Sequence, residues 1–442
     1  MENAAQERRM NVFTVIWLGQ LISLVGTGLT GFALGIWVFQ RTGSVTQFAL
    51  ISLFTILPSI LISPLAGALV DRWDRRKVMI FSDLAAGTST LITTLLLFGG
   101  RLEIWHIYAL VSLGSLAGAF RMPAYMALTA LTVPRKQMGR ASGMMQVAPA
   151  ASQVVAPILA AVLIAKIGME GVVLVDFATF LVAVVTLLFV KVPKPPAAGA
   201  KRQSIWSEAL HGWRYIGARP GLLWLLLFLA LINVTYGFAQ VLFTPMILSF
   251  ADSKTLGTVL SVGATGFLAG SILASVWGGP ARKINGVLGF SLLYGGCLVL
   301  AGARQSVPLI SAALFGLVFC LPLINACNQA IWMSKTAPEF HGRVFATRTM
   351  ISWSAGPLAF LLAGPLADKV FEPLLARGGP LAASAGAFTG TGPGRGIGFF
   401  FMLIGLLAVL VVPLVGYMNR RVRYIEDELP DAVPAQGAPA VA

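Results

Sequence analysis

Twelve long runs of apolar residues constrain this chain more than any other feature. Each run has about 20 residues or more, the length that an α-helix needs to cross the roughly 30 Å hydrocarbon core of a bilayer. The 442 residues have a mean hydropathy of +0.82, and only 11% of them are charged. An outer-membrane β-barrel would show short alternating segments instead. The sequence therefore predicts an all-α multispan membrane protein.

The first apolar run is too long for a signal-peptide core and has no small-residue cleavage site, so we expect the mature protein to keep it. The predicted membrane spans are Val12–Phe39, Phe48–Val70, Val78–Phe98, Ile104–Met126, Ser142–Ile167, Gly171–Val190, Leu222–Leu248, Leu256–Trp277, Val287–Ala303, Val307–Trp332, Val344–Ala367 and Gly398–Tyr417.

The distribution of Lys and Arg predicts the orientation, because these residues favour the cytoplasmic side of a membrane. If the N-terminus is cytoplasmic, only eight of the 32 basic residues fall on the outer side. Those eight are Arg41, Arg101, Lys166, Lys254, Arg304, Lys369, Arg377 and Arg395. We therefore expect a multi-pass protein of the cell membrane with both termini in the cytoplasm.

The sequence also predicts two related halves. Residues 1–192 and 221–424 each hold six spans, and a linker with an amphipathic helix, 193–220, joins them. Motifs recur about 200 residues apart: Arg140 with Arg343, Pro157 with Pro357, and Arg76 with Arg282. Such spacing indicates duplication of a six-helix unit, and hence two pseudo-symmetric bundles. Residues 425–442 have the composition of a disordered cytoplasmic tail.

The most specific motif is the charged turn after the second span, "GALVDRWDRRK" (67–77). It resembles the signature G-x-L-x-D-R-x-G-R-[RK] of the major facilitator superfamily, with Asp74 in place of the usual glycine. The resemblance covers about residues 11–424. It implies a conformational latch, in which Asp71 faces the N-terminal end of span 11 and pairs with Arg75. The expected latch residues are Gly67, Asp71, Arg72, Arg75 and Arg76.

Span 5 is similar to a Gly-rich pattern that antiporters of this family carry there. Most positions are small without being glycine, so a close-packing role is expected more firmly than antiport. The positions are Gly143, Ser152, Ala156, Pro157, Ala160 and Ala161. "PEFHGRVFATRTM" and the loop ending "GTGPGRG" resemble the exporter branch that includes macrolide efflux and enterobactin export proteins.

Among the charged residues inside predicted spans, Asp83, Arg121 and Asp176 are the candidates for function, because an ionised group there costs at least about 2.5–3.5 kcal/mol. Asp83 and Arg121 lie at similar depth, which favours an ion pair between them over proton carriage by Asp83. Asp176, nearer the outer side, is a hydrogen-bonded packing residue or a second proton site.

The resemblance implies a substrate cavity lined by spans 1, 4, 7 and 10. Polar stripes on three of these spans supply candidates, although hydrogen bonding between helices is the alternative for each. The candidates are Gln20, Ser23, Thr27, Thr30, Asn233, Tyr236, Gln240, Thr244, Asn325, Asn328, Gln329 and Trp332. Amides and aromatics with few charges suit a bulky neutral or amphiphilic solute.

Several other functions are excluded. The net charge of +15 is spread over short turns, which argues against nucleic acid. "GTGLTG" (26–31) lies inside an apolar run, and no acidic residue follows at the spacing of about 20 that dinucleotide binding requires. No ATP-binding loop motif and no metal-ligand spacing occur, so we expect no cofactor, no metal and no enzymatic activity.

The resemblance implies a secondary transporter that works by alternating access. We expect it to act as a monomer and to export a drug, siderophore or secondary metabolite in exchange for protons. A lysophospholipid-type lipid transporter is the alternative within transport. A non-transporting membrane enzyme or scaffold is the alternative from another class.

Overall fold

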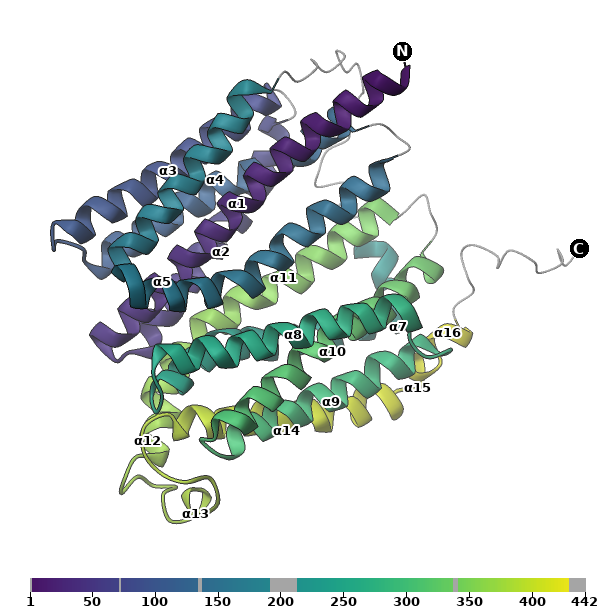
Figure 1. Ribbon diagram of the computed structural model, residues 1–442. Coiled ribbons are helices and arrows are strands. Elements are labelled where there is room, and N and C mark those ends of the chain that lie inside the picture. The colour runs from purple at the N-terminus through teal and green to yellow at the C-terminus, as the bar shows by residue number, and fades with distance from the viewer. Residues whose placement is uncertain (1, 71–72, 134–136, 191–212, 337–340, 429–442) are drawn as a thin grey trace, which may run out of the picture. The chain divides into compact units, whose positions relative to one another are not determined.

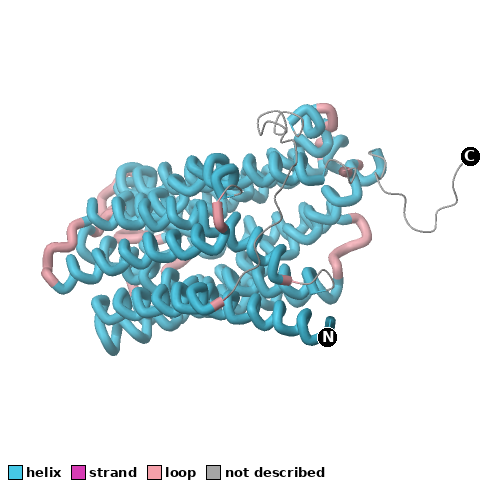
Figure 2. The backbone as a smooth tube through the Cα atoms, turned by 90° about the horizontal axis from the view of Figure 1, so that it is seen from above, coloured by secondary structure: helices cyan, strands magenta, loops and turns pink. Residues whose placement is uncertain are grey.

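A computed structural model describes residues 2–70, 73–133, 137–190, 213–336 and 341–428. Every regular element among these residues is helical, as the tube in Figure 2 shows. The chain divides into two compact units, an N-terminal unit, Met1–Ala200, and a C-terminal unit, Lys201–Ala442. The all-α multispan fold predicted from the apolar runs is confirmed.

Five long helices form the N-terminal unit (Figure 1). They are α1 (Glu2–Thr42), α2 (Val45–Val70), α3 (Arg75–Phe98), α4 (Ile104–Thr132) and α5 (Met138–Phe189). One hydrophobic cluster joins Phe13 of α1, Val78 of α3, Leu128 of α4 and Leu187 of α5. Because the cluster combines the beginnings of α1 and α3 with the ends of α4 and α5, α1 and α3 run in the direction opposite to α4 and to the final part of α5.

The helix α5 contains two predicted spans. As one straight helix, its 52 residues would be about 78 Å long, more than twice the hydrocarbon core. Gly168 interrupts it with φ 70°, a conformation that glycine adopts without steric cost. On one side of this break, the Ser152 hydroxyl donates to the Leu24 carbonyl; on the other, Thr186 packs against Gly19. Both halves therefore pack along α1 as a hairpin. Because α5 holds two spans, the eleven apolar helices found among the described residues are enough for twelve crossings.

The C-terminal unit has five long helices and several short ones. The long helices are α7 (Pro220–Leu248), α8 (Ser253–Trp277), α9 (Lys283–Ala303), α10 (Val307–Lys335) and α11 (His341–Leu366). The last span is α14 (Arg395–Val411), continued by the π-helix η4 (Val412–Tyr417). The short elements are η3 (Ala367–Phe371), α12 (Glu372–Leu375), α13 (Ala385–Thr389), α15 (Arg420–Arg423) and α16 (Ile425–Glu428).

The same packing partners recur in both units. In the N-terminal unit, α1 packs on α5, α2 and α3 pack on α4, and α3 packs on α5. In the C-terminal unit, α7 packs on α11, α8 and α9 pack on α10, and α9 packs on α14. Counted by span, each pair in one unit corresponds to the pair six spans later in the other. The internal repeat thus extends from sequence motifs to helix packing.

Glycines set how closely the last of these pairs approaches. A Cβ on Gly405 would lie 2.7 Å from the carbonyl oxygen of Gly295, and a Cβ on Gly302 would meet the carbonyl of Gly398. Nothing larger than glycine fits there, so the backbones of α9 and α14 touch at two places. Small residues allow such approaches between membrane helices, where dispersion contacts replace the hydrophobic effect.

The end of the last span departs from prediction in geometry. The π-helix η4 contains Pro413, which has no N–H for the regular ladder. The amide of Met418 accordingly donates to the carbonyl of Pro413, five residues back. A hydropathy run measures how far a span extends, but it does not register this change of helix type.

The segments flanking the C-terminal unit also differ from prediction. We expected disorder from residue 425 onward, but Ile425–Glu428 form helix α16, and Ile425 is fully buried. Most of the predicted amphipathic linker helix lies outside the described residues. Residues 213–217 are helical, and the Tyr215 hydroxyl donates to the carbonyl of Lys335, so this end of the linker packs on the C-terminal unit.

Candidate functional site

The N-terminal unit brings two of its three membrane charges together. Arg121 of α4 and Asp83 of α3 lie 3.6 Å apart, measured from Nη1 to Oδ1. The side-chain amide of Gln20 donates to the other carboxylate oxygen, Oδ2, at 2.8 Å. Asp83 is fully buried, whereas Arg121 keeps 23% of its side chain exposed. The result is a network across α1, α3 and α4 in which Asp83 has both a counter-charge and a neutral donor.

Asp176 of α5 has a different environment. It is 1% exposed, and it forms no ion pair with any residue that the structure describes. The Thr90 hydroxyl lies 3.4 Å from Oδ2, and the Thr179 hydroxyl lies 3.5 Å from Oδ1, both long for hydrogen bonds. Thr179 also donates to the backbone carbonyl of Asp176 at 2.7 Å. The carboxyl group is therefore buried among hydroxyls that direct little of their hydrogen bonding to it.

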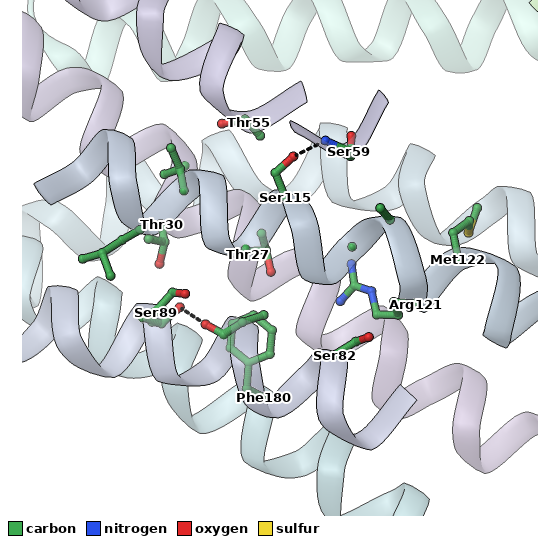
Figure 3. Close-up of a pocket in the computed structure, with 18 of the residues that line it drawn as sticks. Thr27, Thr30, Thr55, Ser59, Ser82, Ser89, Ser115, Arg121, Met122 and Phe180 are labelled. Carbon is green, nitrogen blue, oxygen red and sulfur yellow. Dashed lines mark hydrogen bonds between the residues drawn. The ribbon is translucent and has the colours of Figure 1, made fainter. Parts of the chain in front are cut away.

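A cavity of about 610 Å³ lies among α1, α2, α3, α4 and α5 (Figure 3). Arg121 and Asp176 are the charged residues of its wall. Its hydroxyl-bearing lining residues are Thr27, Thr30, Thr55, Ser59, Ser63, Ser82, Ser89, Thr90, Thr93 and Ser115. A pocket of this volume is in the range that accommodates a drug-sized molecule.

The cavity has a buried floor and an exposed rim. Ser89 and Thr93 of α3, with Phe180 of α5, are each at most 5% exposed. Met122 and Met126 of α4 are at least 50% exposed, and they offer flexible thioethers to whatever enters. A ligand would therefore meet apolar sulfur groups first and polar hydroxyls deeper inside.

Most of this cavity was not predicted from the sequence. The predicted candidates lie on spans 1, 7 and 10, whereas much of the lining comes from Ser and Thr residues of α2 and α3. A signal was present: Ser82, Ser89 and Thr93 recur at helical spacing, as do Thr55, Ser59 and Ser63. Membrane helices often carry such residues for hydrogen bonding to their own backbone, so spacing alone does not predict a shared cavity.

The predicted stripe on span 1 is divided between two environments. Thr27 and Thr30 line the cavity. Gln20 instead lies against Asp83, and Ser23 is fully buried. Only half of this stripe is therefore available to a solute within the N-terminal unit.

In the C-terminal unit, the stripe on α7 is also mixed. Gln240 is exposed, Asn233 and Tyr236 are partly exposed, and Thr244 is buried. On α10, Asn325 and Gln329 are exposed, whereas Asn328 and Trp332 are buried.

Arg348 of α11 adds a cation beside the α10 stripe. It donates to the side-chain oxygen of Gln329 at 2.8 Å, and its guanidinium lies 5.4 Å from the centre of the Trp332 ring. Span 10 therefore offers Asn325 and Gln329 at its surface, with Gln329 held by Arg348.

The small residues of span 5 pack on α1. A Cβ on Gly28 would lie 2.7 Å from the Cβ of Ala156 and 3.0 Å from the Ser152 hydroxyl. Ala156 and Ala160 are both buried, and Pro157 and Ala161 are partly exposed. Gly143 also lies in α5. The structure therefore places Ser152 and Ala156 of this motif in a close helix contact between α1 and α5.

The charged turn is described in part. Gly67 lies in the last turn of α2, and Arg75 is the first residue of α3. Asp71 and Arg72 lie outside the described residues, and so does the predicted contact between Asp71 and Arg75. Asp74 caps the N-terminus of α3, since its carboxylate accepts hydrogen bonds from the amides of Arg76 and Lys77. Its φ of −67° does not require glycine, so aspartate can replace the usual residue here.

Arg76 has a role that the sequence did not reveal. Its guanidinium donates to the carbonyls of Leu187 and Leu188, each at 2.7 Å. These carbonyls belong to the last turn of α5, where no following turn of the helix supplies N–H groups to donate to them. A cation also complements the negative end of the helix dipole, so Arg76 fixes the end of α5 to the start of α3.

No group of three metal-ligating side chains occurs among the described residues. The three cysteines, Cys297, Cys320 and Cys327, are buried and free, within α9 and α10.

Known proteins resemble this chain over most of its length. Macrolide efflux protein A of Streptococcus pyogenes is 28% identical over 371 residues, covering 81% of this chain and 90% of that protein. The multidrug efflux pump Tap of Mycolicibacterium fortuitum is 27% identical over 370 residues, covering 80% and 88%.

Solved structures agree with the fold. A bacterial homologue of the human lysosomal transporter Spinster, in an inward-facing and unoccupied conformation, superposes with a TM-score of 0.72 at 14% identity. The match covers 97% of this chain and 99% of that chain. A bacterial homologue of the iron transporter ferroportin matches with a TM-score of 0.67 at 16% identity, covering 92% and 98%.

The family model of the Major Facilitator Superfamily matches residues 16–360, well over half of the chain. Together with the transporter relatives, this match identifies a membrane transporter and not an enzyme. The chain belongs to the Major Facilitator Superfamily.

Proposed function

We propose that this transporter exports a hydrophobic or amphiphilic small molecule across the cell membrane in exchange for protons. The observation that carries the proposal is Asp176, a carboxyl group buried inside a membrane helix with no ion-pair partner among the described residues. The relatives named macrolide efflux protein A and multidrug efflux pump Tap support the direction and the substrate class.

Proton exchange needs a group whose protonation differs between two states of the transporter. A charge in a low-dielectric interior is costly unless it is paired, so the group must alternate between hydrated and desolvated environments. Asp176 lines a cavity large enough for water, and its hydroxyl neighbours hold it weakly. Water or a ligand in the cavity would therefore change the relative free energies of its two protonation states.

Asp83 has the opposite character. Arg121 lies within ion-pair distance of its carboxylate, and Gln20 donates a hydrogen bond to it, in the conformation that the structure describes. Removing one partner of such a pair leaves an uncompensated buried charge, whereas removing both can be nearly neutral. We therefore assign Asp83 and Arg121 a structural role, and Asp176 the coupling role.

The remaining sequence predictions fit this mechanism as proposals. The turn with Gly67, Asp71, Arg72, Arg75 and Arg76 acts as the conformational latch. The exposed polar residues Thr27, Gln240, Asn325 and Gln329 contact the solute. Both termini lie in the cytoplasm, and the working unit is the monomer.

Transport in proteoliposomes tests the coupling. An imposed pH gradient should drive accumulation of a fluorescent lipophilic probe by the unmodified protein. Asp176→Asn should still exchange probe between the two sides but should not accumulate it. The double variant Asp83→Asn with Arg121→Gln, in contrast, should keep gradient-driven accumulation.

Two results would contradict the proposal. Accumulation that responds to sodium or membrane potential, but not to a pH gradient, would exclude proton exchange. Gradient-driven accumulation by a well-folded Asp176→Asn protein would exclude Asp176 as the coupling group. Expression in a drug-sensitive bacterial host, with macrolides tested first, would show which solutes are exported.

A further inference from the structure

Several of the hydroxyl groups that line the N-terminal cavity donate their protons to carbonyls of their own helices. The hydroxyl of Thr55 donates to the carbonyl of Ile51 at 2.7 Å, and that of Thr93 donates to the carbonyl of Ser89 at 2.9 Å. Thr27, Ser59 and Ser89 make the same kind of bond to carbonyls of their own helices. Each hydroxyl has one proton and two lone pairs, so what remains available on these five residues is acceptor capacity.

The charged residues of the wall strengthen this bias. Arg121 is a cation, but Asp83 lies 3.6 Å from it and balances its charge. Asp176 is an acceptor, and no cation lies within ion-pair distance of it in the described chain. The Thr30 hydroxyl approaches Asp176 from α1 but makes no hydrogen bond of good geometry. The wall is therefore rich in acceptors and contains a negative charge whenever Asp176 is ionised.

The occupant that matches this wall carries several N–H donors and a positive charge on an apolar body. The buried floor provides acceptors for the donors, and the exposed rim of Met122 and Met126 provides apolar contact. We propose that this cavity binds the ammonium group of an amphiphilic primary amine, directed at Asp176. The proposal names the substrate class and rests on the proposed export function only in treating the bound amine as cargo.

Equilibrium binding tests this site without any gradient. The full-length protein would be held in lipid nanodiscs, with empty nanodiscs subtracted. The probe is dansylcadaverine, a fluorescent amine with a primary ammonium. Two derivatives separate the contributions: the trimethylammonium form keeps the charge without N–H donors, and the N-acetyl form has no charge.

The expected order of affinity is ammonium, then trimethylammonium, then N-acetyl. The first and last should differ about tenfold or more, because hydrogen bonds to charged groups contribute about 1.5–3 kcal/mol. Asp176→Asn should weaken the ammonium probe about tenfold and leave the N-acetyl probe within about twofold.

A matched pair on α3 tests the hydroxyl wall. Thr93→Val removes a lining acceptor and should weaken the ammonium probe about threefold to fivefold. Thr88→Val is the control, since the Thr88 hydroxyl makes the same bond to its own helix, at 2.8 Å to Leu84, but is exposed outside the cavity. Thr88→Val should leave binding unchanged.

Equal affinity for the ammonium and N-acetyl probes would overturn the proposal. So would equal weakening by Thr88→Val and Thr93→Val. If Asp176→Asn does not fold, the order of the three probes on the unmodified protein decides the question. Binding in the expected order without export of the amine would leave this site standing and reject export, whereas export without this order of binding would do the reverse.

Discussion

In the N-terminal unit residues 71–74 join α2 to α3, and in the C-terminal unit residues 278–282 join α8 to α9. These connections are copies of one motif, with Arg76 and Arg282 at corresponding positions. Both arginines reach the far end of their own unit, but they meet different groups. Arg76 binds the backbone carbonyls of Leu187 and Leu188, whereas Arg282 pairs with the carboxylate of Asp427 at 2.8 Å.

The caps of the two following helices differ in the same way. The helix α3 is capped by Asp74, one residue before it begins. The helix α9 has no side-chain cap from its own turn; Glu426 accepts hydrogen bonds from the amides of Lys283 and Ile284 instead. In both copies a carboxylate caps the helix that follows the turn. The carboxylate comes from the turn itself in α3, and from the C-terminal segment in α9. The second copy thereby became dependent on the C-terminal segment.

The largest effect on transport is expected at Asp71. The corresponding position in the second copy is Trp277, which has no charge, so the second copy cannot replace the carboxylate of Asp71. Asp71→Asn should abolish or severely slow transport while the protein remains folded, since the sequence predicts that Asp71 lies in a turn and not in a core. Transport in proteoliposomes, with the yield of monodisperse protein, measures both parts.

The control for this prediction is Asp74→Asn. Asparagine caps helices about as well as aspartate, so this variant should transport normally. Near-normal transport by a well-expressed Asp71→Asn protein would contradict the latch.

The second prediction concerns the C-terminal segment. A chain ending after Tyr424 loses the fully buried Ile425, both bonds from Glu426, and the carbonyl that accepts from the buried ammonium of Lys335 at 2.6 Å. The free energy of unfolding, measured by SDS titration in mixed micelles, should fall by about 4 kcal/mol. A chain ending after Glu428 should be as stable as the full chain. Equal stability of the two truncated chains would show that α16 is dispensable.

The third prediction concerns Arg76. Arg76→Ala removes two charge-assisted hydrogen bonds at a partly exposed site, so the free energy of unfolding should fall by about 2 kcal/mol. Arg76→Lys keeps the charge but not the forked geometry, and it should recover about half of that loss. The same SDS titration measures both variants, and a lysine variant no better than alanine would mean that charge contributes little.

The smallest effect is expected for the ion pair between Arg282 and Asp427, whose side chains are about half exposed. A double-mutant cycle with alanine at both positions should give a coupling free energy below about 0.5 kcal/mol, and less at high salt. A coupling as large as the Arg76→Ala effect would contradict this prediction, because the two copies would then be energetically equivalent.

The sequence predicted the span count and the pairing of Asp83 with Arg121 for a simple physical reason. Membrane helices rise about 1.5 Å per residue, so position within an apolar run gives depth, and depth restricts which charges can meet. The Asp74 cap was also within reach of sequence reasoning, because a cap and its helix are neighbours in the chain.

Other features depended on contacts far apart in sequence. Glu426 lies more than 140 residues from the amides it caps, and its segment has the composition of a disordered tail. The hydroxyls of the cavity converge only when α1, α2, α3 and α4 are assembled. Sequence patterns report each helix separately, so neither arrangement could be predicted from them.

The two ends of α9 have a consequence for the order of biogenesis. Glu426 satisfies amides at its start, and Arg395 donates to the carbonyls of Gly302 and Ala303 at its finish. Both partners are synthesised about 90 residues or more after the end of α9. Until then α9 has unpaired amides at its start and unpaired carbonyls at its end, and its glycines lack their contacts with α14. Maturation of this half therefore waits for α14 and α16 to be synthesised, and termination before them would leave α9 for quality-control proteases to recognise.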